Sequence, residues 1–120
     1  MKTTPPLETE ERPWGRYDVL LDEDCCKVKK ITVNPHARLS YQKHLRREEV
    51  WTIVQGTAII TLDGQEMEHS AGDVIHIPKE AAHRIANTKD ETVIFIEIQR
   101  GDYFGEDDII RIEDDYGRHV

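Results

Sequence analysis

The chain has 120 residues, of which 38% are hydrophobic and 33% are charged, and its formal net charge is −8. This length fits one domain of ordinary size and leaves little room for a second. An acidic chain without a basic run is repelled by the phosphate backbone, which argues against nucleic-acid binding. No segment approaches the run of about 20 apolar residues that crosses a membrane, so we expect no membrane partner.

The first part of the chain differs from the rest. Residues 1–12 carry prolines and acidic residues and contain no apolar stretch, so they predict a disordered lead without a signal peptide. An ordered domain is expected over residues 13–120. Two adjacent cysteines follow, Cys25 and Cys26, and neighbours rarely form a disulfide because the geometry is strained. We therefore expect reduced thiols and a cytoplasmic location.

Short β-rich runs and turns make up the rest of the sequence. Strands are expected at residues 17–21, 28–33, 51–54, 58–62, 65–69, 74–77, 93–99 and 109–112. Asp63-Gly64 is typical of a two-residue hairpin turn. No stretch of useful length has the period of a helix. Eight or nine short strands predict an all-β fold, either a closed barrel or a two-sheet jelly roll.

Polar residues with metal-binding potential form a first group in residues 42–49. Gln42 and His44 are two apart, so in a strand their side chains share one face. Glu49 follows after a short corner, and a hairpin would return it beside His44. Gly56 then closes a turn that requires a conformation only glycine adopts easily.

A second group contributes His83 at the start of a later strand. Antiparallel pairing would direct His83 toward the same interior point as the first group. Together the two groups supply two imidazoles, one carboxylate and one amide oxygen. This set suits one divalent ion such as Zn²⁺, Mn²⁺, Fe²⁺, Co²⁺ or Ni²⁺, and open coordination positions would allow Lewis-acid chemistry.

The spacings resemble the two motifs of the cupin superfamily, H-x-H-x3/4-E-x6-G and G-x5-P-x-G-x2-H-x3-N. Gln42 stands in the place of the first histidine and Glu80 in that of the inner glycine. The resemblance implies a cupin double-stranded β-helix, a single-domain jelly-roll barrel. It also implies that Gln42, His44, Glu49 and His83 bind the metal ion.

A closer resemblance covers nearly the whole chain. It is carried by residues 12–15, 28–33, 39–42, 96–103, 105–109, Arg111 and 115–118. These segments are similar to type II mannose-6-phosphate isomerases, cupin domains often fused behind a mannose-1-phosphate guanylyltransferase domain, in which the first metal position is also glutamine. The resemblance implies interconversion of mannose 6-phosphate and fructose 6-phosphate in sugar-nucleotide and polysaccharide precursor metabolism. It implies a phosphorylated sugar as ligand, a homodimer, and a separate nucleotidyltransferase chain as a partner.

The implied reaction moves a proton between carbons 1 and 2, which requires a base. Glu97 is our candidate because strand alternation places it on one face with Val93, Phe95 and Gln99. The alternative is a salt bridge from Glu97 to a buried Lys29 or an arginine. Lys29 shares a strand face with apolar residues, so we expect it beside the site as a second catalytic residue.

The phosphate requires cations. Arg111 and Arg118 match family positions and suit bidentate binding, with surface pairing to neighbouring acids as the alternative. We add Asn87 and Gln99 to the substrate-binding set. Arg84 is predicted to point outward. Four further cations are expected on a solvated rim: Arg38, Lys43, Arg46 and Arg47.

One difference from the family pattern concerns catalytic turnover. The family tends to carry histidine where this chain has Leu45, Arg46 and Val50. If those histidines transfer protons, this chain lacks them. Two alternatives therefore stay open: a non-catalytic metal- and sugar-binding cupin that partners a guanylyltransferase, and another metal-cupin enzyme such as an Fe²⁺ oxygenase. Gln42 argues against the oxygenase, because such enzymes usually present histidine there.

Overall fold

The computed structural model describes residues 5–118, and within that range it contains β-strands and no helix. No described segment is therefore a helix that could cross a membrane. The strands are β1 (Glu8–Arg12), β2 (Gly15–Asp22), β3 (Cys26–Val33), β4 (Tyr41–Lys43), β5 (Arg47–Gln55), β6 (Thr57–Leu62), β7 (Gln65–Ser70), β8 (Val74–Ile77), β9 (His83–Ala86), β10 (Val93–Gly101) and β11 (Ile110–Glu113).

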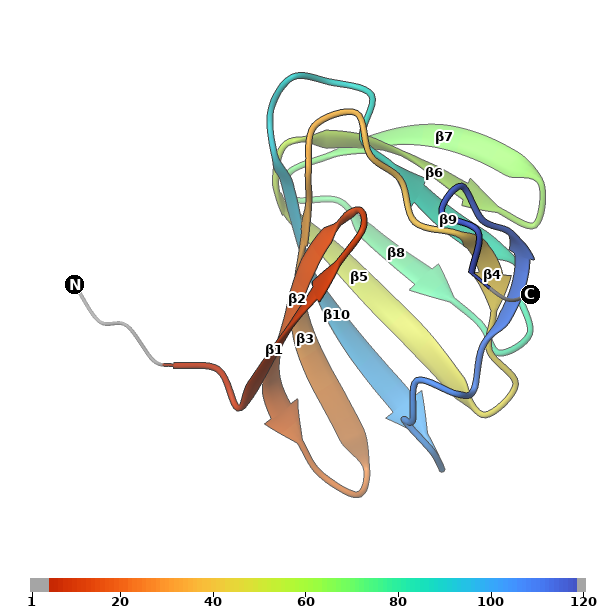
Figure 1. The fold of residues 1–120 in the computed structure, drawn as a ribbon. Coiled ribbons are helices and arrows are strands. Elements are labelled where there is room, and N and C mark those ends of the chain that lie inside the picture. Colours follow the sequence, from red (N-terminus) through yellow and green to blue (C-terminus); the bar gives the residue numbers. More distant parts are fainter. Residues whose placement is uncertain (1–4, 119–120) are drawn as a thin grey trace.

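Two antiparallel sheets face each other (Figure 1). The larger sheet has the order β1-β2-β3-β10-β5-β8, and the smaller sheet has the order β11-β4-β9-β6-β7. Strands distant in sequence thus become neighbours, since β3 and β5 both pair with β10. The predicted all-β, two-sheet architecture is confirmed.

The core lies between the sheets and follows the alternation of the strands. In β3, the buried positions are Lys29, Ile31 and Val33, and β10 buries Val93 and Phe95 in the same way. Burying an aliphatic or aromatic side chain of this kind contributes about 1.5–3 kcal/mol. Lys29 lies on the same strand face as these apolar residues and therefore points inward. Packing of the core thus also fixes the position of charged groups in the site.

The N-terminal prediction was wrong for residues 8–12. These residues form β1, which pairs along its length with β2. Thr9 Oγ1 donates a hydrogen bond of 2.7 Å to Asp18 Oδ1, and Trp14, directly after the strand, is buried. A polar edge strand is held by backbone hydrogen bonds, which composition does not reveal. Residues 1–4 of the predicted lead lie outside the described residues.

The C-terminal segment connects the two sheets. After β10 ends, the chain crosses from the larger sheet to the edge of the smaller one, where β11 pairs with β4 (Figure 1). The predicted last strand at 109–112 is confirmed to within one residue. Arg111 lies opposite Gln42 in this pairing, so the C-terminal strand borders the predicted metal site.

Candidate active site

His44, Glu49 and His83 meet in the interior and form a group able to hold a metal ion. Each offers one ligand atom, and these atoms all lie within 4.8 Å of one another. His44 Nε2 is 3.3 Å from Glu49 Oε2, and His83 Nε2 is 3.7 Å from Glu49 Oε1. All three side chains are buried. Two segments distant in sequence, residues 44–49 and the start of β9, therefore bring these three side chains together.

The backbone fixes which nitrogen each imidazole presents. His44 Nδ1 lies 2.5 Å from the carbonyl oxygen of Asp108, and His83 Nδ1 lies 2.9 Å from that of Ala81. A carbonyl only accepts hydrogen bonds, so each Nδ1 carries the hydrogen and each Nε2 keeps its lone pair. Burial, with the charge of Arg47 next, lowers the pKa of His44 to about 4. Both rings are thus oriented as metal ligands usually are.

Gln42 stands directly opposite His83 in the β4–β9 pairing and lines the central cavity. Its Nε2 donates a hydrogen bond of 3.1 Å to Ser40 Oγ. With the amide nitrogen engaged, the amide oxygen is the atom that Gln42 can offer to a ligand. Two imidazole nitrogens, one carboxylate and one amide oxygen fit a borderline divalent ion.

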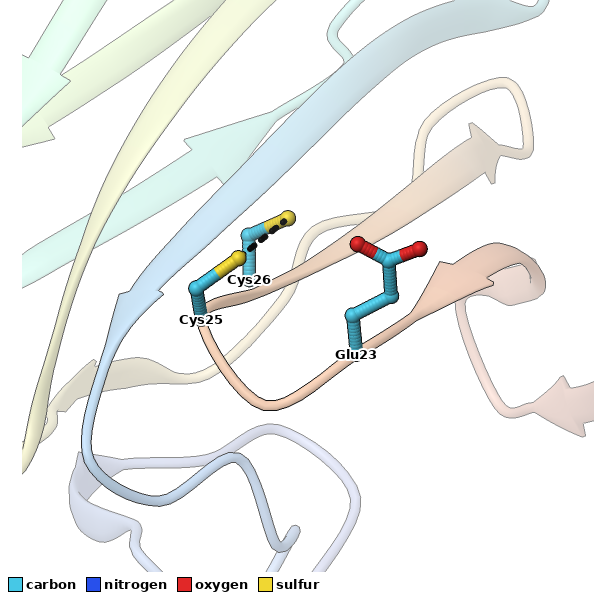
Figure 2. A group of neighbouring side chains, drawn as sticks. All are labelled: Glu23, Cys25 and Cys26. Atoms are coloured by element: carbon cyan, nitrogen blue, oxygen red, sulfur yellow. Dashed lines mark hydrogen bonds between the residues drawn. The ribbon is translucent and has the colours of Figure 1, made fainter.

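A second group of possible metal ligands lies on the turn between β2 and β3. It consists of Glu23, Cys25 and Cys26 (Figure 2). The two Sγ atoms are 3.9 Å apart, and both cysteines are free, as predicted. Desolvation and the neighbouring Cys25 thiol raise the pKa of Cys26, whereas metal binding needs the thiolate. The interior group is therefore the better candidate.

Glu49 and Glu97 form a buried carboxylate pair. The indole Nε1 of Trp51 donates to both, with 3.1 Å to Glu49 Oε1 and 3.1 Å to Glu97 Oε2. Burial acts to raise the pKa of Glu49, but the charge of Arg47 and its hydrogen bond to Glu49 prevail and lower it. Burial and the charge of Glu49 raise the pKa of Glu97. Two adjacent carboxyl groups are thus driven toward opposite protonation states.

The prediction that Arg47 lies on a solvated rim is wrong. Its side chain is only 5% exposed, its Nε donates to Glu49 Oε2 at 2.8 Å, and its Nη2 lies 3.2 Å from His44 Nε2. The strand expected from Trp51 in fact begins at Arg47. Alternation therefore places Arg47, Glu49 and Trp51 on the same inward face.

The other cations differ in their surroundings. Arg38 and Arg46 pair near the surface with Asp115 and Asp102, and Lys43 is half-buried. Arg84, predicted to point outward, is buried because the C-terminal strand covers it. Its Nε donates to the Leu39 carbonyl oxygen and its Nη1 pairs with Glu113.

Lys29 and the proposed substrate residues fall into three groups. Lys29, Arg111 and Arg118 line the cavity. Gln99 is fully buried, and its Nε2 donates to Glu97 Oε1 at 2.6 Å. Asn87 Nδ2 donates to three backbone carbonyl oxygens, those of Val33, Asn34 and Glu91. Asn87 therefore holds a turn together, and among the described residues it is not one that lines the cavity.

The cavity at this site measures about 60 Å³ and is strongly cationic. Its charged lining residues are Arg12, Lys29, Arg47, Arg84, Arg111 and Arg118 and the carboxylates Glu49, Glu97 and Glu106. Six cations against three carboxylates make the lining more cationic than the chain as a whole, which carries −8, although Glu10, Glu113 and Asp114 outside the lining pair with three of the six. Such local charge attracts an anionic ligand. Glu106 was not predicted as part of the site.

The three positions where the family tends to carry histidine lie away from this cavity. Leu45 and Arg46 are exposed. Val50 follows Glu49 in β5, so its side chain points to the opposite face, where it pairs with Ile98 and His76 of the neighbouring strands. Histidines at these positions would not point into the interior of this structure.

Comparisons with known proteins agree with this geometry. The family model described as "Mannose-6-phosphate isomerase C-terminal" matches residues 5–114. The alginate biosynthesis protein AlgA of Pseudomonas aeruginosa is 46% identical over 107 residues, which are 89% of this chain and 22% of that protein. The mannose-1-phosphate guanylyltransferase of Escherichia coli K12 is 42% identical over 89% of this chain and 22% of its own length. The chain thus spans about a fifth of the length of these curated relatives.

Solved structures confirm the fold. A Klebsiella pneumoniae protein with a double-stranded β-helix domain superposes with a TM-score of 0.71 at 21% identity, over 80% of this chain and 82% of that one. The cupin domain of Schizosaccharomyces pombe Cnp3 superposes with a TM-score of 0.70 at 16% identity, over 72% and 64% of the two chains. The predicted cupin double-stranded β-helix is confirmed.

Proposed function

Because the chain belongs to the mannose-6-phosphate isomerase C-terminal family, we propose that it is a metal-dependent isomerase interconverting mannose 6-phosphate and fructose 6-phosphate. One observation carries the proposal. A carboxyl group with a raised pKa, Glu97, lies beside a carboxylate ligand, Glu49, and one indole N–H binds both. Paired acids with separated pKa values are typical of proton-transfer sites.

Gln42, His44, Glu49 and His83 would hold one divalent ion, of Zn²⁺, Mn²⁺, Co²⁺, Ni²⁺ or Fe²⁺ type. When bound, that ion would polarise the sugar oxygens on carbons 1 and 2. The backbone carbonyls of Asp108 and Ala81 keep the two imidazoles in the required tautomer.

Glu97 would take the proton from one carbon and return it to the other. A carboxyl group whose pKa is raised is suited to both steps. Gln99 and Trp51 each donate a hydrogen bond to Glu97, which fixes its two oxygens. Lys29, predicted as a second catalytic residue, lines the same cavity and offers a positive charge to a negatively charged sugar ligand.

The cations of the cavity would bind the phosphate, and Arg111 and Arg118, the candidates from the sequence, line its C-terminal wall. Relatives named for alginate and xanthan biosynthesis suggest that the product feeds a polysaccharide precursor. Relatives named mannose-1-phosphate guanylyltransferase suggest a nucleotidyltransferase as the partner in that route, and we propose a separate chain for this role. The homodimer and the cytoplasmic location stay predictions.

The test is fructose 6-phosphate formation from mannose 6-phosphate by metal-free protein reloaded separately with Zn²⁺, Mn²⁺, Co²⁺ and Ni²⁺. We expect metal-dependent turnover that is lost in Gln42→Ala and His83→Ala and retained in His76→Ala, a matched histidine that is exposed on β8. Absence of turnover with every metal, in protein shown to bind one, would refute the isomerase.

One observation favours a second function, a sugar-binding cupin without turnover. The Arg47 guanidinium contacts both Glu49 Oε2 and His44 Nε2, so it already neutralises the carboxylate without a metal ion. In that case mannose 6-phosphate would bind metal-free protein and remain unchanged.

A further inference from the structure

We infer that Lys29 and Arg47 form an anion-binding subsite that Glu106 occupies in this structure, and that the phosphate group of a ligand displaces the Glu106 carboxylate. This inference deepens the proposed function, since it names the group that binds the phosphate and the residue that closes the site. It can be tested without turnover.

The two cations of this subsite are buried. The side chain of Lys29 is 3% exposed and that of Arg47 is 5% exposed. Buried charges are costly unless an opposite charge pairs with them. Arg47 has Glu49 on one side, through its Nε. Lys29 has the ring of Tyr17, with Nζ 4.0 Å from the ring centroid, and the carboxylate of Glu106.

A single oxygen of Glu106 reaches both cations. Oε2 lies 2.7 Å from Lys29 Nζ and 3.7 Å from Arg47 Nη1. The second distance is too long for a hydrogen bond, and Nη1 has no hydrogen-bond partner within residues 5–118 although it is buried. A donor that is buried and unsatisfied beside an anion marks a site whose best occupant has more acceptor oxygens than a carboxylate. A phosphate dianion meets that requirement and also carries twice the charge.

The side chain of Glu106 can leave the subsite without refolding of the chain. Its side chain is 44% exposed, so part of it already faces solvent. The backbone beside it is fixed, because Asp108 Oδ1 and Oδ2 accept hydrogen bonds from the backbone nitrogens of Leu45 and Arg46 at 3.1 and 3.0 Å. Rotation of one side chain is thus enough to open the subsite.

Two other cations of the cavity are less suited to this role. The guanidinium of Arg118 is bound at two nitrogens by Asp114, at 3.0 and 2.8 Å. Arg84 is engaged by Glu113 and by the carbonyl oxygen of Leu39. The side chain of Asp114 is only 1% exposed, whereas Glu106, the partner of Lys29, is half-exposed and belongs to a crossing segment. The cavity of about 60 Å³ is also smaller than the roughly 300 Å³ or more of typical ligand pockets, as expected when an internal carboxylate fills its mouth.

The experiment titrates inorganic phosphate into the metal-free full chain by calorimetry. Removing the competing charge in Glu106→Gln should tighten phosphate binding about tenfold, while the same charge change in Asp102→Asn, in the same segment but paired outside with Arg46, should leave it unchanged. Lys29→Met should weaken binding at least about tenfold. Lys30→Met, one residue along β3 on the opposite face, should not.

Mannose 6-phosphate and mannose form the second arm. The phosphorylated sugar should respond to Glu106→Gln as inorganic phosphate does, and mannose should not. Unchanged phosphate affinity in folded Glu106→Gln protein would overturn the inference. Loss of binding in Arg118→Met but not in Lys29→Met would do the same. Phosphate binding that follows the predicted pattern in a protein without isomerase activity would sustain the subsite and refute only the proposed function.

Discussion

Arg47 Nη2 lies 3.2 Å from His44 Nε2, the nitrogen that the imidazole would give to a metal ion. Through Nε, the same guanidinium donates to Glu49 Oε2 at 2.8 Å. One fixed cation thus contacts two of the four proposed ligands. In the metal-free chain it satisfies the buried carboxylate, and it must retreat before a divalent ion can bind both residues.

Replacing Arg47 by methionine should strengthen metal binding. The like charge near the ion disappears, and at the effective dielectric of a partly buried site we expect a gain of about tenfold in Co²⁺ affinity. Competition with a chelator indicator would measure it. Arg46→Met, the neighbouring exposed arginine, is the control. Equal or weaker Co²⁺ binding in Arg47→Met would show that the guanidinium supports the site and does not compete for it.

His44 should make the metal-free protein sensitive to acid. Its pKa is lowered from 6.5 to about 4 in the folded chain. Between these values the unfolded chain binds a proton that the folded chain does not, so the free energy of unfolding falls as the pH drops from about 6.5 to about 4. Urea unfolding across this window should show a loss about 3 kcal/mol larger in the wild type than in His44→Gln. The exposed His36→Gln variant should behave as the wild type, and identical pH slopes in all three proteins would contradict the prediction.

Glu97→Gln should separate catalysis from stability. Because burial and the charge of Glu49 raise the pKa of Glu97, the neutral amide should leave the free energy of unfolding at pH 7 unchanged or higher. The isomerase rate should fall by about 100-fold or more, the usual contribution of a general base. Glu66→Gln, on the exposed β7 strand, serves as the control. A variant with the full rate would remove Glu97 from the mechanism, and a large loss of stability would show that its charge is structural.

Two glycines with similar positive φ angles allow a matched test of the close contact between Gly56 and the backbone of Thr92. Gly56 has φ +88° and Gly64 has φ +83°. A Cβ on Gly56 would lie 2.8 Å from the carbonyl oxygen of Thr92, whereas one on Gly64 would meet nothing within 4 Å. Gly64→Ala should lose about 1–2 kcal/mol from conformation alone. Gly56→Ala should lose roughly 1–3 kcal/mol more through overpacking, and equal losses in urea unfolding would show that this approach costs nothing.

Strand alternation predicted much of the site. It placed Lys29 with Ile31, and Glu97 with Phe95, on faces that the structure buries. The Asp63-Gly64 turn was also predicted, and both residues have positive φ between β6 and β7. These features depend on neighbours along the chain, which is the information that a local pattern contains.

Long-range contacts account for the failures. Strand alternation places Arg84 on the face opposite His83, and the prediction that it points outward follows from that. The alternation cannot show that Glu113, 29 residues later, covers Arg84. Glu106 reads as one of many acidic residues, and only the fold brings it to Lys29, 77 residues away. Nothing in the acidic runs of the sequence distinguishes Glu106 from the other Asp and Glu residues.

The hydrogen bond from His44 to the Asp108 carbonyl joins residues 64 apart. During translation the ribosome releases both imidazoles and Glu49 well before Asp108, so the nascent chain carries metal-binding side chains whose orientation is not yet fixed. Domains generally fold as units once their sequence is available. Capture of the metal ion in the productive geometry therefore has to wait until the segment that contains Asp108 has been synthesised, so the order of synthesis itself delays loading.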